Sequence, residues 1–317
     1  MQALALKQTI PLPGVTGKFD HFAFDAAGQR LFAAATGHHS IEVIDVANNK
    51  TQQSITGLGK PHGLIWVAST KSLYVADGSR AELSVYQSSS DSQLKLAGTL
   101  KLSDDADDMT YNQANHLLFI GHGGGDSANP ARIAVVDTDH FALLTDLPVT
   151  THPEALEIDE QGQRIFANIA ESSEIAVIDG TGKTIKAIWK LTKAHDNVPL
   201  AYNTTYQTLY VACRAPATLI ALDATSGEEI SSLPTGEGAD DLFYDAALGR
   251  IYVISGAGQV DVYQVNPDKT LRSLGIIRTA IGAKTALFVP SQSALYVGIP
   301  GNAAQSAEIR IYSTVSK

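Results

Sequence analysis

The sequence predicts an all-β fold, a seven-bladed β-propeller with four-stranded blades, and three observations lead to this prediction. A second strand-like segment with alternating apolar residues follows each repeat anchor, for example at residues 41–44, 83–86 and 133–136. No stretch sustains a helical period, and repeats of about 40–45 residues with four strands each are typical of propellers. The anchor is an apolar–aromatic pair that recurs at spacings of 42 to 47 residues: Leu31-Phe32, Leu73-Tyr74, Leu118-Phe119, Ile165-Phe166, Leu209-Tyr210, Ile251-Tyr252 and Leu295-Tyr296.

The two ends of the chain are expected to share one blade. The seventh repeat reaches Lys317 after its third strand, so its outer strand is missing. Residues 4–10 precede the first repeat and read as a strand, so they can supply it. Such closure protects the strand edges that an open array would expose. We therefore expect residues 1–317 to form one propeller domain without a linker, and to be monomeric.

Composition and net charge exclude some classes of binding partner. Hydrophobic residues make up 44% of the chain and charged residues 18%, which suits a packed core. The net charge of −10 argues against nucleic acid or an anionic membrane as a partner, because both need a basic face. No apolar run approaches the roughly 20 residues of a membrane span, and residues 1–7 do not resemble a signal peptide. The lone Cys213 excludes an internal disulfide.

A ring of ionisable residues is expected at one mouth of the central channel, where the first strand of each blade starts. The position eleven residues before each anchor is ionisable in six of seven repeats: Asp20, His62, Asp107, Glu154, Val198, Asp240 and Lys284. The next position adds a histidine and two carboxylates: His21, Gly63, Asp108, Ala155, Pro199, Asp241 and Thr285. Equivalent residues of successive blades lie around a shared axis, so these side chains should converge.

The ring suggests a bound divalent cation. Two carboxylates about 6 Å apart repel by roughly 3 kcal/mol at an effective dielectric constant near 20. Carboxylates alone would suit Ca²⁺, whereas added imidazoles favour Zn²⁺, Mn²⁺, Fe or Cu. Two alternatives remain open: a solvated acidic channel with salt bridges to Lys284, and a site for a cationic or polyhydroxyl ligand without metal. The metal ligands expected are Asp20, His21, His62, Asp107, Glu154 and Asp240.

Other residues on the same face are candidates for catalysis and for binding a small polar molecule. His62 and His152 are expected as ligands or general bases, and Asp108 or Asp241 as a base outside the coordination shell. Arginines in the loops after second strands could hold a carboxylate or phosphate, or could link neighbouring blades. The substrate-binding candidates are His38, His39, Arg80, His122, Asn197, Arg214 and Lys284.

Several segments resemble the YVTN-repeat β-propellers, namely residues 73–77 (LYVAD), 209–212 (LYVA) and 251–253 (IYV). This family includes binding scaffolds, lactonase-like hydrolases and cofactor-bearing domains, and the resemblance implies an exported or periplasmic origin. The chain is more distantly similar to the gluconolactonase and senescence-marker propellers, which hold a divalent cation through Glu, Asn and Asp. The ligand residues expected here differ from that set, so the activity of those propellers is not assigned to this chain.

These observations give two hypotheses of function. The first is metal-assisted hydrolysis of a lactone or similar ester at the channel mouth, a reaction class that rests on the likeness of fold. The second is a non-catalytic scaffold that presents its loops to a protein or cell-surface partner.

Overall fold

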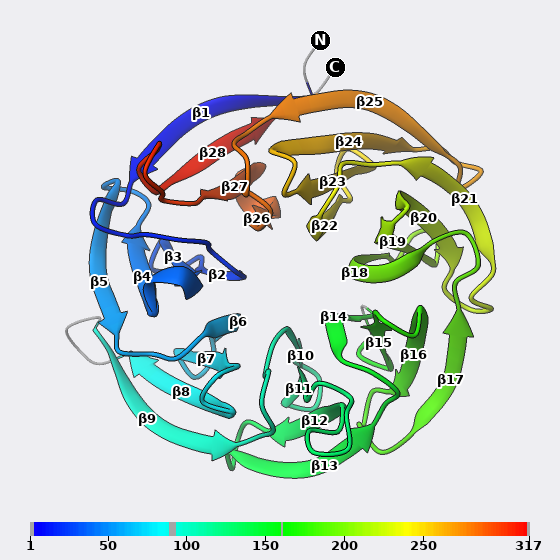
Figure 1. Cartoon of the computed structure of the whole chain (residues 1–317), viewed down its shortest axis with the longest axis horizontal. Coiled ribbons are helices and arrows are strands. Elements are labelled where there is room, and N and C mark those ends of the chain that lie inside the picture. Colours follow the sequence, from blue (N-terminus) through cyan, green and yellow to red (C-terminus); the bar gives the residue numbers. More distant parts are fainter. Residues whose placement is uncertain (1–2, 89–92, 160, 316–317) are drawn as a thin grey trace.

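The computed structural model describes residues 3–88, 93–159 and 161–315, and within them the chain forms a ring of seven four-stranded antiparallel sheets (Figure 1). The innermost strands surround the central channel: β2 (Phe22–Asp25), β6 (Pro61–Val67), β10 (Met109–Asn112), β14 (Pro153–Ile158), β18 (His195–Asn203), β22 (Ala239–Asp245) and β26 (Ala286–Val289). The second strands each contain one anchor pair: β3 (Arg30–Ala35), β7 (Ser72–Asp77), β11 (Leu117–His122), β15 (Arg164–Ile169), β19 (Thr208–Ala215), β23 (Arg250–Ser255) and β27 (Ala294–Ile299).

The outer half of each blade follows in chain order. The third strands are β4 (Ser40–Asp45), β8 (Glu82–Ser88), β12 (Arg132–Asp137), β16 (Glu174–Asp179), β20 (Ala217–Asp223), β24 (Gln259–Val265) and β28 (Glu308–Thr314). The outermost strands are β5 (Lys50–Thr56), β9 (Leu94–Lys101), β13 (Ala142–Pro148), β17 (Ile185–Lys190), β21 (Glu229–Pro234), β25 (Leu271–Arg278) and β1 (Leu4–Pro11). Two short 3₁₀ turns, η1 (Thr36–His38) and η2 (Pro290–Gln292), complete the described elements, and no described helix has the length and apolar character to cross a bilayer.

The seventh blade is closed by the N-terminal strand, which confirms the prediction. β1 pairs antiparallel with β28, from Leu4 opposite Thr314 to Pro11 opposite Glu308. Both ends of the chain therefore lie at the same blade (Figure 1).

Aromatic contacts between successive blades form much of the core. The aromatic residue of each anchor is buried and faces the next blade. Its partner there is the residue four positions after the ionisable channel-mouth position of that next blade. This residue is aromatic in six of the seven repeats. Ring centroids lie 5.1 to 5.9 Å apart in five such pairs: Phe32–Trp66, Phe166–Tyr202, Tyr210–Tyr244, Tyr252–Phe288 and Tyr296–Phe24. Each pair buries a large apolar area and fixes one blade against its neighbour.

The closing strand should contribute to stability through its buried face. Ile10 of β1 is fully buried, so Ile10→Ala should lower the free energy of unfolding by about 2–5 kcal/mol. Leu6 of the same strand is 55% exposed, so Leu6→Ala should cost less than about 0.5 kcal/mol. Urea denaturation of both variants checks this, and equal losses would contradict the role assigned to β1.

Candidate functional site

The seven predicted ring residues line one cavity of about 150 Å³ at the channel mouth. Each comes from the start of an innermost strand or from the residues just before it, so successive blades bring them to a common axis. Their neighbours around this mouth cavity are Lys18, His21, Ala155 and Arg214.

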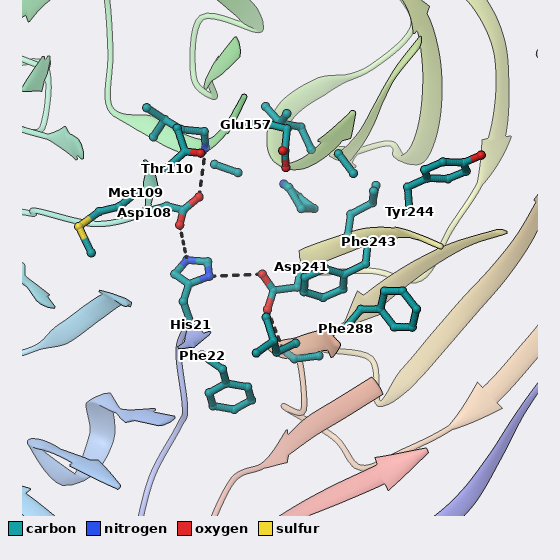
Figure 2. A pocket seen from close by; sticks show the side chains of 18 of the residues that line it. His21, Phe22, Asp108, Met109, Thr110, Glu157, Asp241, Phe243, Tyr244 and Phe288 are labelled. Atoms are coloured by element: carbon teal, nitrogen blue, oxygen red, sulfur yellow. Dashed lines mark hydrogen bonds and ion pairs between the residues drawn. The ribbon is translucent and has the colours of Figure 1, made fainter. Parts of the chain in front are cut away.

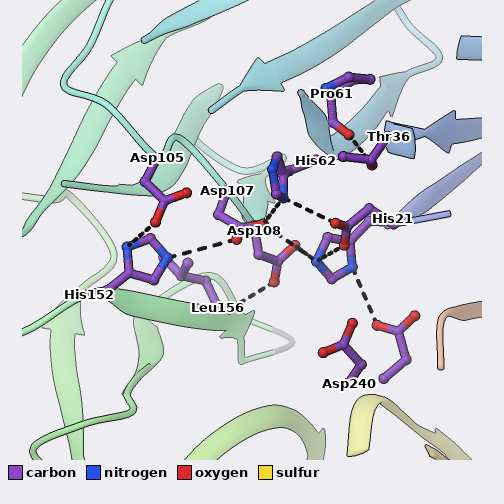
Figure 3. A network of polar contacts seen from close by, with 12 residues as sticks. His21, Thr36, Pro61, His62, Asp105, Asp107, Asp108, His152, Leu156 and Asp240 are labelled. Carbon is purple, nitrogen blue, oxygen red and sulfur yellow. Dashed lines mark hydrogen bonds and ion pairs between the residues drawn. The ribbon is translucent and has the colours of Figure 1, made fainter. Parts of the chain in front are cut away.

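Asp107 lies among three histidines (Figure 3). Two imidazole nitrogens lie near its Oδ1 and one lies near its Oδ2. Its Oδ1 is 3.4 Å from His62 Nδ1 and 3.9 Å from His21 Nε2, while its Oδ2 is 3.8 Å from His152 Nε2. Asp20 completes the group, with its oxygens 3.1 Å from His62 Nδ1 and 3.7 Å from His21 Nε2. These side chains come from blades 1 to 4, which are distant in sequence.

The donor atoms are spaced as ligands of a shared cation would be. Two ligand atoms that are each about 2.1 Å from one tetrahedral ion lie about 3.4 Å apart. Two groups have donor atoms within 4.8 Å of one another, Asp20 with His21 and Asp107, and Asp107 with His152 and Glu154. Asp107 Oδ1 is buried and has no hydrogen-bond partner among the described residues. The donor set therefore fits a cation, and Asp107 belongs to both groups.

Burial and charge shift the ionisation of these groups in opposite directions. Burial opposes protonation of His62, but its contacts with Asp107 and Asp20 outweigh this effect and raise its pKa to about 10. Burial also opposes protonation of His152, but its contact with Asp107 outweighs this effect and raises its pKa to about 9. Burial would raise the pKa of Asp107, yet His152 and His62 hold it well below its usual value. For Glu154, burial and the nearby Asp107 raise the pKa to about 7.

Asp240 is a ring residue that belongs to neither group of potential ligands. Lys284 Nζ lies 2.6 Å from Asp240 Oδ2, and Arg214 donates a hydrogen bond to Asp240 Oδ1. The structure thus gives Asp240 two cationic partners where the sequence suggested a metal ligand. Arg214 and Lys284 line the mouth cavity, and their role in binding a substrate stays a prediction.

His21 lines both the mouth cavity and a larger cavity further along the channel, and two carboxylates lie beside its ring nitrogens (Figure 2). Its Nδ1 is 3.3 Å from Asp241 Oδ1, and its Nε2 is 4.0 Å from Asp108 Oδ1. Burial opposes protonation of His21, but these carboxylates raise its pKa well above the usual value. The other oxygen of Asp241 accepts the Ala286 N–H at 2.7 Å, and that of Asp108 accepts the Leu156 N–H at 3.1 Å.

Asp108 or Asp241 was expected as a base outside the coordination shell, and both carboxylates face His21. Neither lines the mouth cavity, and both line a larger cavity on the other side of His21. Their observed contacts hold the His21 ring and the inner strands of the next blades.

Five predicted substrate-binding residues lie outside both cavities. His122 is buried, accepts the Ser103 N–H through Nδ1, and lies 2.9 Å from Asp146 through Nε2. Asn197 is also buried, and its amide donates to Asn168 Oδ1 and to the Glu174 carbonyl. The other three contact loop atoms elsewhere: His38 contacts Thr16, His39 contacts the Gly59 carbonyl, and Arg80 contacts the Gly57 carbonyl.

Three charged residues near the site were not predicted. Lys18 Nζ lies 3.4 Å from Asp20 Oδ2, and Asp105 Oδ2 lies 3.8 Å from His152 Nδ1. Glu157 lines the larger cavity on the other side of His21. Each lies within three positions of a ring residue in the sequence. Including the three residues on either side of every ring position would have identified them.

Comparison with known proteins supports the fold alone. A chain of a mitotic checkpoint complex has a TM-score of 0.81 and 11% identity, over 98% of this chain and 92% of that one. Hydrazine synthase of Kuenenia stuttgartiensis has a TM-score of 0.81 and 13% identity, over 96% of this chain and 99% of that one. Neither a family model nor a curated protein matches the sequence. The chain is thus similar in structure to propellers of very different sequence.

The raised histidine pKa values predict a stability that falls with rising pH. A histidine whose pKa is raised on folding stabilises the folded state fully below its unfolded pKa and loses this contribution as the pH passes its folded pKa. For His62 this range runs from 6.5 to about 10. In chelator-treated protein the free energy of unfolding should fall over this range, and His62→Gln should reduce the slope. Urea denaturation at several pH values measures both slopes, and equal slopes would contradict the assignment.

Proposed function

We propose that the protein binds a divalent metal cation at the channel mouth and acts there on a small polar molecule, with hydrolysis of a lactone or ester as the reaction. The observation that carries this proposal is the arrangement around Asp107, where three histidine nitrogens stand 3.4 to 3.9 Å from its oxygens and Oδ1 lacks a hydrogen bond among the described residues. We propose also that the repeats are of the YVTN kind, on the segments at 73–77 and 209–212.

Asp20, His21 and Asp107 would hold the cation, with His62 beside them, and His152 and Glu154 would complete a second position. A mixed set of imidazoles and carboxylates favours Zn²⁺ or Mn²⁺ over Ca²⁺. Such an ion, when bound, polarises a carbonyl and lowers the pKa of a bound water.

The residues beside the ligands suit proton transfer and charge balance. With a cation at the first position only, Glu154 is free of metal, and its pKa of about 7 is close to the value that best serves a general base near neutral pH. Arg214 and Lys284 leave 30% and 27% of their side chains exposed while pairing with Asp240, so their free N–H groups can bind a substrate oxygen. His62 would orient Asp20 and Asp107 through its Nδ1.

A scaffold that binds a protein partner is the second candidate. One of the structurally similar chains belongs to a protein complex and the other to an enzyme, so the likeness of fold favours neither candidate. Most exposed large apolar side chains are spread over the outermost strands of five blades: Leu6, Leu96, Leu143, Leu144, Ile188 and Ile276. Ile281 lies in the loop between β25 and β26. This distribution offers no concentrated docking patch. The scaffold hypothesis predicts that the double variant Asp107→Ala/Glu154→Ala keeps its partner.

Metal binding can be measured directly. Calorimetric titration of chelator-treated protein with Zn²⁺ or Mn²⁺ should show binding accompanied by proton release, because His62 and His152 are protonated without metal. Asp107→Asn should weaken binding by about 100-fold, because this carboxylate belongs to both ligand groups. Asp139→Asn is a matched control, since Asp139 pairs with His116 at the surface. Absence of binding to the wild-type protein would remove the metal mechanism.

Hydrolysis should depend on the metal. A panel of lactones and esters, assayed with and without added Zn²⁺ or Mn²⁺, should show turnover that a chelator abolishes. His62→Ala should lower this turnover by about 100-fold or more, because it removes the group that holds Asp20 and Asp107. Turnover that survives the chelator would contradict the proposal, and a complete lack of turnover would favour the scaffold.

A further inference from the structure

A second cavity of about 490 Å³ lies on the other side of His21 and has a different chemical character (Figure 2). We call it the channel chamber. It shares only His21 and Ala155 with the described lining of the mouth cavity. Elsewhere its lining comes from residues nearer the C-terminal ends of the innermost strands, such as Tyr202 and Tyr244. Its volume falls within the range of about 300–1,000 Å³ that is typical of small-molecule sites.

Glu157 is the one charged residue among the seven equivalent residues that lie three positions after the ring residues. The residues three positions beyond the ring are Ala23, Ile65, Thr110, Glu157, Ala201, Phe243 and Leu287. The Glu157 side chain points into the chamber, as Figure 2 shows. The one hydrogen bond it accepts within the described chain comes from the N–H of the adjacent Ile158, at 3.3 Å.

The Glu157 carboxylate lacks a counterion. No described lysine, arginine or histidine forms an ion pair with it, whereas His21 is already balanced by Asp108 and Asp241. Burial, together with the nearby charge of Asp108, raises the pKa of Glu157 to about 7. A cation in the chamber would compensate this charge, while an anion would be repelled by all three carboxylates.

Apolar side chains supply the rest of the expected binding surface. The Phe243 ring lines the chamber (Figure 2), together with Leu64, Ile65 and Leu287. Tyr202, Tyr244 and Phe288 also border it, but their rings pack against the anchor aromatics of the preceding blades. The face of the Phe243 ring attracts cations, and the apolar side chains contact the hydrocarbon part of a ligand. Inorganic cations prefer several oxygen ligands, so one unpaired carboxylate among apolar side chains suits an organic ammonium ion better.

We propose that the channel chamber binds a small organic ammonium ion with an apolar body, whose charge pairs with Glu157 and whose body packs against Phe243 and its apolar neighbours. This site is separate from the metal centre and does not depend on it.

The test compares two probes of similar shape, 2-phenylethylammonium and the neutral 2-phenylethanol, by calorimetric titration of chelator-treated protein. The wild-type protein should bind the ammonium probe about tenfold more tightly than the alcohol. Glu157→Gln should weaken ammonium binding by about tenfold and leave alcohol binding unchanged, because it removes the charge and keeps the shape. Phe243→Leu should weaken binding of both probes, since the ring contacts the body they share.

Two controls separate the chamber from the channel mouth. Asp107→Asn should leave ammonium affinity unchanged, and Glu157→Gln should leave Zn²⁺ affinity and the melting temperature unchanged. Ammonium binding that is lost in Asp107→Asn but kept in Glu157→Gln would place the cation at the mouth and overturn the proposal. Equal affinity for ammonium and alcohol would also overturn it. Either result would leave the proposed metal centre standing, because that centre is tested by metal titration alone.

Discussion

The contact on which both cavities depend is the one that His21 makes with Asp108 and Asp241 across the channel. It joins blade 1 to blades 3 and 6, while the same carboxylates accept backbone N–H groups of blades 4 and 7. A buried charge needs a partner of opposite sign and hydrogen bonds; each carboxylate here faces His21 and accepts a backbone N–H. Five of seven blades are thus connected through one imidazole, in addition to the aromatic contacts between neighbours.

This junction divides the channel into two chemical environments. On one side, carboxylates, histidines, Lys284 and Arg214 crowd into a small polar space. On the other side, apolar and aromatic side chains surround a larger space with few charges. Both environments arise from the same seven innermost strands, because residues one or more positions further along a strand lie deeper in the channel.

Repetition explains which features the sequence predicts. The anchor pairs identify the blades, and counting back from them identifies seven of the eleven residues that line the mouth cavity. This works because equivalent positions lie at equal depth along the axis. It does not reveal individual partners, which differ between blades. His122 and Asn197 come from the end of the channel that holds the mouth cavity. Their buried side chains nevertheless form hydrogen bonds or ion pairs with other residues and do not line the cavity. The pairing of Asp240 with Lys284 depends likewise on two particular blades.

The closure between β1 and β28 has a consequence for how the chain can fold. β1 finds its partner only after the chain has been made through β28, so the six blades between them are synthesised before the ring can close. Contacts between such distant segments slow folding, and the free edge of β28 stays unpaired until β1 reaches it. A blade built from two strands so far apart in the sequence therefore makes synthesis through β28 a precondition of the closed ring.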